Sequence, residues 1–218
     1  MRAAARNCSS CHRVDPTPMP SPIGHALAGI SVGLAMAPLF RSGLATIPLP
    51  WRAGTSRPGA ATFDPRARKI MTPESSVLVL CAIASVAPDL DLLFGTHSTY
   101  THSIGAVALV FLVTLAATSW RVAAAVALAW GSHLLLDWLG NDTRAPLGIM
   151  AFWPFTNEHY QSSLHLFNAI SRRYWMPEQF ILGNLKAAFR EIAILAPVAW
   201  VAWMLGRRHR GATGTGTT

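Results

Sequence analysis

The chain alternates between uncharged apolar runs and polar stretches, and the runs set its architecture. Five stand out, at residues 23–40, 75–88, 103–120, 122–136 and 192–206. Residues 23–40 and 103–120 contain no Asp, Glu, Lys or Arg and approach the ~20 residues that a helix needs to cross a bilayer core. The runs lack the apolar–polar alternation of strands, which favours helices. We therefore predict an all-α fold.

The remaining runs are short, so a soluble helical core is the alternative to a membrane bundle. Residues 75–88 and 122–136 stop at acidic residues, and residues 192–206 contain Pro197. Composition favours the membrane, because charged residues make up 13% of the chain, about half the share of an average soluble domain. Small residues recur in the runs, as suits close helix packing in lipid. We expect a polytopic membrane helical bundle of about five spans, multi-pass in the inner (plasma) membrane and in contact with its lipid bilayer.

Polar segments divide the chain around these spans. Residues 1–18 are expected to be a disordered tail or translated upstream sequence, and residues 19–206 the membrane-embedded domain. Within this domain, residues 41–74 predict a basic loop rich in Pro and Gly, and residues 141–190 predict a polar loop. Residues 207–218 predict a basic, low-complexity tail.

The first segment contains Cys8, Cys11 and His12 in the Cys-x-x-Cys-His pattern that attaches c-type haem. No export signal precedes the pattern, and Met19 opens a better beginning, so we expect no haem. We interpret the excess of Lys and Arg behind the net charge of +8 as a signal of membrane topology. It places the basic loop at residues 41–74 on the cytoplasmic side. No basic stripe with interleaved aromatic residues appears, which argues against nucleic-acid binding.

Ionisable side chains interrupt the apolar runs at places that share one membrane face. If the spans alternate in direction, the start of the first, the end of the second, the start of the third and the end of the fourth lie together. Ionisable groups at membrane depth are costly and are usually paired or functional. Three carboxylates and four imidazoles suit Zn²⁺, with Mn²⁺ or Fe²⁺ as alternatives. The candidate metal ligands are His25, Asp89, Asp91, His97, His102, His133 and Asp137.

Individual members of this set leave alternatives open. His133 and Asp137 are four residues apart and share one helix face, as a hydrogen-bonded pair, as two ligands, or as a ligand held by a carboxylate. Asp89 and Asp91 share a site only if the backbone there is non-helical, and Pro88 predicts a break at Ala87. Otherwise these carboxylates cap a helix.

An ordered set of motifs resembles a known family. The motifs are Met19-Pro-Ser-Pro-Ile-Gly-His25, Pro88-Asp-Leu-Asp91, His97-Ser-Thr-Tyr-Thr-His-Ser103, Ser132-His-Leu-Leu-Leu-Asp137 and Trp153-Pro154. They are similar to those of the YdjM family of inner-membrane-associated, metal-dependent hydrolases, over residues 19–155. The resemblance implies a helical membrane protein whose metal site is built from the seven candidate ligands. Ser98 stands where the family often has Arg, which removes one anion contact and weakens the case for a phosphate-bearing substrate.

The expected function is hydrolysis by metal-activated water. Asp91 or Asp137 would act as the general base or orient it. The arrangement of His and Asp on helices is loosely similar to zinc-dependent phospholipase C, so a lipid ester or phosphodiester is the expected substrate. The alternative is a non-catalytic membrane metal-binding protein, either a metal carrier or a metal-stabilised interaction module. A carrier needs ligands on both faces or a path through the membrane midplane, whereas these ligands gather on one face, which favours the hydrolase.

Overall fold

The computed structural model describes residues 20–41, 73–94, 98–142, 146–171 and 175–212. Regular structure in these ranges is helical apart from two isolated β-bridges, which confirms the predicted all-α class. The expectations for residues 1–18 and for the greater part of the basic loop lie outside the described residues. The elements are α1 (Pro22–Met36), α2 (Pro38–Arg41), α3 (Pro73–Val86), η3 (Ala87–Phe94), η4 (Tyr100–His102), α4 (Ile104–Ala117), α5 (Trp120–Leu139) and α6 (Pro177–Ala212).

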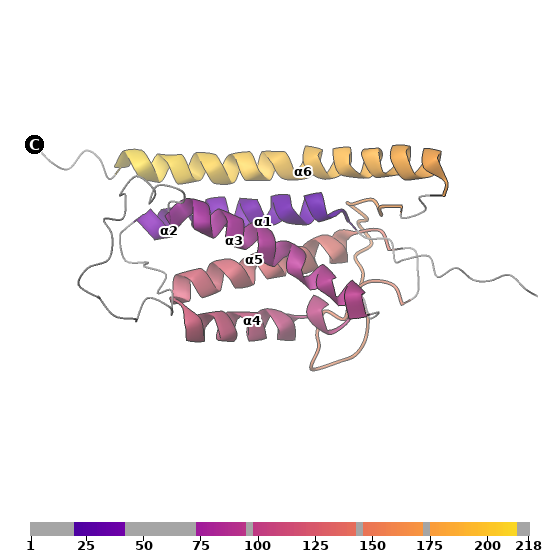
Figure 1. Ribbon diagram of the computed structural model, residues 1–218, viewed down its shortest axis with the longest axis horizontal. Coiled ribbons are helices and arrows are strands. Elements are labelled where there is room, and N and C mark those ends of the chain that lie inside the picture. The colour runs from indigo at the N-terminus through magenta and orange to yellow at the C-terminus, as the bar shows by residue number, and fades with distance from the viewer. Residues whose placement is uncertain (1–19, 42–72, 95–97, 143–145, 172–174, 213–218) are drawn as a thin grey trace, which may run out of the picture.

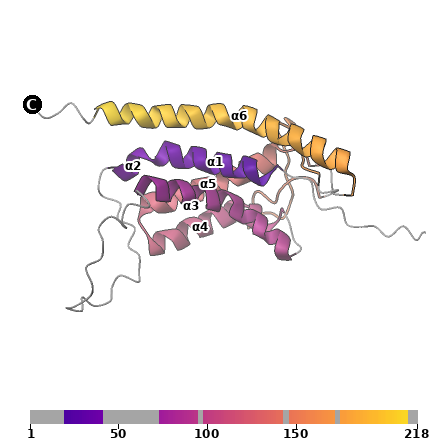
Figure 2. The ribbon, with the colours of Figure 1, turned by 45° about the horizontal axis from the view of Figure 1, so that its top comes forward.

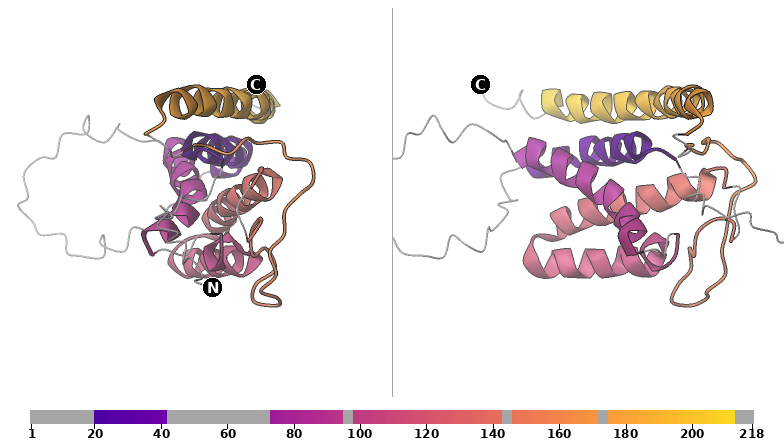
Figure 3. Two further views of the ribbon diagram at one scale, coloured as in Figure 1. Left: turned by 90° about the vertical axis from the view of Figure 1, so that its right-hand side faces the viewer. Right: turned by 45° about the vertical axis from the view of Figure 1, so that its right-hand side comes forward.

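The long helices run side by side (Figure 1). Helices α3 and α5 pack against α1, α4 packs against α5, and α6 lies along α1 on the outside of the bundle. Figure 2 shows the same order of layers from another side. The end view in Figure 3 places α6 and α4 at opposite edges, with α1, α3 and α5 between them. The bundle interior therefore lies among α1, α3 and α5.

Local sequence sets where the helices begin and end. Pro22 opens α1 after the N-cap Ser21, whose Oγ accepts a hydrogen bond from the Gly24 amide. The α-helical part of α3 ends at Val86, directly before the 3-10 helix η3 that contains Pro88. Proline has no amide hydrogen and disfavours the α conformation in the residue before it. The α-helix thus breaks at Pro88 as expected, but Asp89 and Asp91 lie on a 3-10 helix rather than on a non-helical backbone.

Small residues bring the inner helices close together. Ala125 and Ala129 of α5 pack with Val77 and Cys81 of α3 in one buried apolar cluster. On α1, Gly29 lies so near α3 that an added Cβ would come within 2.2 Å of Ser85 Oγ and 2.4 Å of the Cys81 carbonyl oxygen. This close packing is the kind that helices in lipid use for association.

Three helical segments are long and apolar enough to cross a membrane, at Glu74–Phe94, Trp120–Leu139 and Phe180–Arg208. The apolar helices α1 and α4 are shorter, with 15 and 14 residues. The described residues thus contain three candidate spans, and two shorter apolar helices stand where the other two of the five spans were predicted.

The expected polar loop at 141–190 is too long, because α6 begins at Pro177 and continues through Pro197. The polar residues that indicated a loop are instead anchors of this helix. The Asn184 side chain accepts a hydrogen bond from the Ser171 amide and donates one to the Ser171 carbonyl. Arg190 donates to Asn168 Oδ1 at 3.0 Å. Polar side chains on one face of a helix look like loop sequence when their partners are not known.

Candidate metal centre

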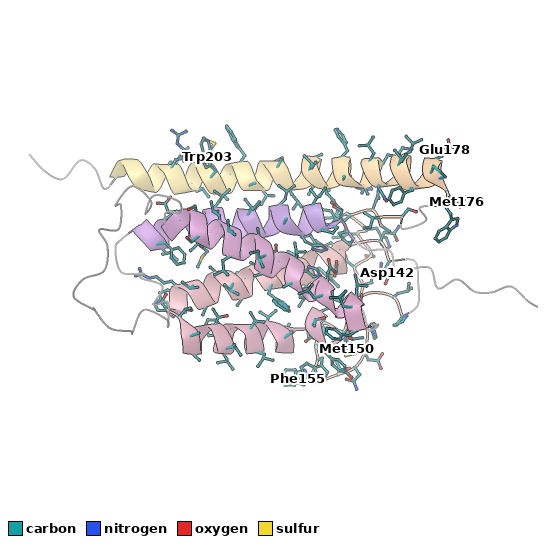
Figure 4. All side chains as sticks on the ribbon, in the orientation of Figure 1. Asp142, Met150, Phe155, Met176, Glu178 and Trp203 are labelled. Atoms are coloured by element: carbon teal, nitrogen blue, oxygen red, sulfur yellow. The ribbon has the colours of Figure 1, made fainter. Side chains whose placement is uncertain are left out.

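The predicted ligands converge at one end of the bundle. The start of α1, the 3-10 segments η3 and η4, and the C-terminal part of α5 all reach the right-hand end in Figure 1. In Figure 4 the labelled Asp142 and Met150 mark this end, and Trp203 lies toward the opposite one. His97 lies outside the described residues. The predicted convergence is confirmed for the six others, namely His25, Asp89, Asp91, His102, His133 and Asp137.

The fully buried ring of His133 has a defined tautomer. Its Nδ1 lies 2.7 Å from the backbone oxygen of Ser85. Ser85 belongs to the last turn of α3, where carbonyl groups lack partners within the helix. Because a carbonyl oxygen only accepts, Nδ1 carries the hydrogen and donates it. In the neutral ring, Nε2 therefore keeps a free lone pair.

His102 is likewise oriented through its Nδ1 atom, by Asp91 and Thr101. Its Nδ1 lies 3.2 Å from Asp91 Oδ2 and 2.9 Å from Thr101 Oγ1, whose hydroxyl donates to the same carboxylate at 2.7 Å. The Nδ1 hydrogen is thus directed at Asp91 and Thr101. The second nitrogen, Nε2, faces the interior of the site.

The two Nε2 atoms meet each other and two carboxylates. They are 3.0 Å apart, and Asp137 Oδ2 lies 3.1 Å from each. Asp89 Oδ1 completes the group at 3.5 Å from His133 Nε2 and 3.9 Å from His102 Nε2. With neutral rings and ionised acids, every one of these atoms is a hydrogen-bond acceptor. A cluster of buried acceptors is stable only around a cation, and this donor set fits a divalent transition metal.

His25 joins the group through its ring face and one carboxylate oxygen. Its ring stacks on that of His133 with centroids 3.8 Å apart, and its Nε2 lies 3.3 Å from Asp137 Oδ1. Neither nitrogen of this fully buried ring has a hydrogen-bond partner among the described residues. His25 forms a second compact ligand group with His133 and Asp137, beside the group of Asp89, His102 and His133.

A proton can take the place of the metal in this cluster. Burial lowers the pKa of His102, but its hydrogen bonds to Asp137 and Asp91 and the charges of these carboxylates outweigh that effect and raise its pKa to about 9. A protonated His102 can donate from both nitrogens, which satisfies the acceptors around it. Binding of a metal at Nε2 would therefore require the loss of this proton.

Asp91 lies on the far side of His102 from the other acids. It contacts Nδ1 rather than Nε2, and it belongs to neither of the two compact ligand groups. Its 6% exposure shows that it is a buried carboxylate with a fixed partner rather than a helix cap open to solvent. In this position Asp91 orients His102 and raises its basicity, as carboxylates beside metal-binding histidines do.

A small pocket of about 10 Å³ adjoins the cluster. Asp137 lines it together with Ser98, Asn141, Asp142 and the backbone around Gly148. This volume is at the lower limit for one water molecule. The turn at this pocket requires glycine, because Gly148 has φ +86° and an added Cβ would lie 2.2 Å from the Tyr160 carbonyl oxygen.

Sequence reasoning missed three residues that build the site. Thr101 and the Ser85 carbonyl fix the two imidazoles. Glu191 of α6 is fully buried and accepts hydrogen bonds from the Ser21 amide at 2.6 Å and from the Ser21 hydroxyl. A glutamate at the edge of the apolar run 192–206 was the available signal for Glu191, whereas a backbone carbonyl gives no sequence signal.

Comparison with protein families identifies the chain. The model of the YdjM inner membrane protein family matches residues 19–211, so the chain belongs to this family and the resemblance seen in its motifs is confirmed. Comparisons with curated proteins and with solved structures find no match.

Proposed function

We propose that this member of the YdjM inner membrane protein family is a membrane-bound, metal-dependent hydrolase. The observation that carries the proposal is the meeting of two imidazole Nε2 atoms, whose Nδ1 hydrogens are directed elsewhere, with the oxygens of Asp137 and Asp89. Such a set of buried acceptors supports a resident cation. The adjoining pocket gives Asp137 access to a water molecule.

The roles of the protein's own residues follow from these contacts. The two compact groups, His25 with His133 and Asp137, and Asp89 with His102 and His133, would hold a divalent metal, with Zn²⁺ the best fit and Mn²⁺ or Fe²⁺ the alternatives. When bound, such a metal lowers the pKa of water towards about 7 and polarises the bond to be cleaved. Asp137 faces both the cluster and the pocket, so it is placed to accept the proton of an attacking water. Asp91 keeps His102 in its metal-binding tautomer.

An apolar groove supports a lipid ester or phosphodiester as the substrate. The groove lies between α4 and α5, has a volume of about 740 Å³ and is lined by side chains such as Phe111, Leu135 and Trp138. It shares Ile149 with the small pocket at Asp137. A lipid chain in the groove would bring its polar linkage to the level of the metal centre.

A non-catalytic metal protein is the second candidate, and the burial of the site favours it. The imidazoles of His25, His102 and His133 are fully buried, and the adjoining pocket is small. Structural zinc sites are closed in this way, whereas catalytic sites keep one position for water. The two functions differ in whether metal-loaded protein turns over substrate.

The test uses Asp137→Asn, which keeps the size of the side chain and removes its charge. The purified protein is assayed for bound metal by mass spectrometry and for hydrolysis of a panel of lipid esters and phosphodiesters. If Asp137 is a direct ligand, the substitution should weaken metal binding by more than about 100-fold. That loss exceeds the usual cost of removing a residue that only supports a ligand. If it acts chiefly as the base, metal should remain and turnover should fall by roughly 10²–10⁴-fold.

Glu158→Gln is the matched control, because Glu158 is an exposed acid in the polar loop at the same end of the molecule. It should keep wild-type metal content and activity. Full metal without hydrolysis of any substrate class in the wild-type protein would favour the non-catalytic function. Wild-type metal and activity in Asp137→Asn would remove Asp137 from the site.

A further inference from the structure

We propose that Glu191 is a positioning residue of the metal centre, which holds His25 in place by fixing the first turn of α1. The proposal rests on metal binding at the site described above, but not on hydrolysis. Glu191 lies on α6, bonds Ser21 rather than a candidate ligand, and acts through Ser21 and the α1 backbone.

Glu191 lies in an environment that requires a partner for its charge. It is fully buried within the candidate span Phe180–Arg208, where an acid is costly unless it is paired. Its carboxylate accepts from both the amide and the hydroxyl of Ser21, the N-cap of α1. The N-terminus of a helix carries unpaired amide groups and a partial positive charge, which stabilise an anion. Glu191 therefore ties α6 to the start of α1.

The close approach of the two helices depends on Gly24. An added Cβ at this position would lie 2.7 Å from Glu191 Oε2 and 2.9 Å from its carboxyl carbon. The Gly24 amide in turn donates to Ser21 Oγ at 3.2 Å. Ser21, Gly24 and Glu191 thus form one small buried polar contact at the end of α1.

His25 is the next residue, and its position depends on this turn. Its amide donates to the Ser21 carbonyl at 3.2 Å. His102 and His133 are each oriented through Nδ1 by a hydrogen-bond partner, whereas neither ring nitrogen of His25 has such a partner among the described residues. Among the described residues, ring stacking on His133 and the backbone of α1 hold His25 beside Asp137. A shift of the first turn of α1 therefore moves His25 directly.

The test measures Co²⁺ binding to the full-length protein through its visible absorption. Glu191→Ala should weaken Co²⁺ binding by roughly 10–100-fold, the cost typical of losing a residue behind a ligand, and should change the spectrum. Glu191→Gln should recover most of the affinity, because its amide oxygen still accepts from the Ser21 amide. Glu178→Gln is the matched control, since Glu178 is an exposed acid on the same helix, and it should bind like wild type.

A double-mutant cycle with His25→Ala separates positioning from a general loss of stability. If Glu191 acts through His25, Glu191→Ala should cause no further loss of Co²⁺ affinity in the His25→Ala background. Independent, additive losses would overturn the proposal. So would Glu191→Ala protein with wild-type affinity and spectrum, even if its melting temperature is lower.

Two further outcomes are decisive. If Glu191→Ala does not fold, Gly24→Ala displaces the carboxylate without removing it, and wild-type Co²⁺ binding by that variant would overturn the proposal. Absence of Co²⁺ binding by the wild-type protein would overturn the metal centre and this inference together. Co²⁺ binding that depends on Glu191, without hydrolysis of any substrate, would contradict the hydrolase function and leave the positioning role intact.

Discussion

At the scale of single residues, the centre is defined by which ring nitrogens are already occupied. His133 gives its Nδ1 hydrogen to Ser85, and His102 directs its own at Asp91, so both Nε2 atoms are left for a cation. The motifs predicted these residues but not their tautomers, because a tautomer is set by partners that fold against the ring. The same contacts distinguish Asp91, behind a ligand, from Asp137 among the ligands.

This distinction predicts different results for the two acids. Asp91→Asn keeps an acceptor near His102 Nδ1 but removes the charge, so metal affinity should fall by roughly 10–100-fold while saturating metal still fills the site. Isothermal titration with Zn²⁺ measures both affinity and stoichiometry. A loss of stoichiometry at saturating Zn²⁺ would instead make Asp91 a direct ligand.

The proton on His102 predicts a pH dependence of metal affinity. Since its pKa in the metal-free protein is about 9, the ring is protonated below that pH and must lose the proton to bind metal. Affinity should therefore rise by about tenfold per pH unit up to about pH 9 and then level off, for one proton released. Co²⁺ titrations at several pH values check this, and an affinity that does not change with pH would contradict it.

At the scale of elements, the centre depends on how closely α1 and α3 pack. Gly29 of α1 packs against Ser85 of α3, and the carbonyl of Ser85 accepts the hydrogen bond that orients His133. The position of this candidate ligand therefore depends on the contact between the two helices. The run of small residues predicted close packing in general. It could not predict that this contact lies behind a ligand, because that depends on the rotation of each helix about its axis.

Gly29→Ala tests this link between packing and the centre. Its Cβ would lie 2.2 Å from Ser85 Oγ and 2.4 Å from the Cys81 carbonyl oxygen, so the helices must separate. Overpacking of this kind costs about 1–3 kcal/mol, and the shift of Ser85 should also lower metal affinity. Thermal unfolding and Co²⁺ titration measure the two effects.

Gly131→Ala provides the matched control on α5, because an added Cβ there meets nothing within 4 Å. Alanine is the better helix former by about 0.5–1 kcal/mol, so this variant should be as stable as wild type or more stable. Equal behaviour of the two variants would contradict the packing argument.

At the scale of the whole molecule, alternation of the spans predicted the convergence of distant residues. Apolar runs were sufficient for this, since a chain that crosses back and forth returns every second connection to the same face. Runs alone did not predict the length of α6, whose polar anchors Asn184 and Arg190 resemble loop residues until their partners are seen. Nor did they identify Glu191, because its partner Ser21 is 170 positions away.

The last prediction concerns how the bundle sits in the membrane. Helices α4 and α5 run between the end with the metal centre and the opposite end, so Glu158 and Trp120 should lie on opposite sides of the bilayer. We expect Trp120 on the cytoplasmic side, together with the basic loop, by the positive-inside rule. With its 14 residues, α4 is only about 21 Å long against a core of about 30 Å, a mismatch that a thinner bilayer or flanking residues reaching the interface would accommodate. Single cysteines at the two positions, in a background without the native cysteines, should react with an impermeant reagent from opposite faces of membrane vesicles. Labelling of both from one face would mean that α5 does not cross the membrane, and it would contradict the proposed topology.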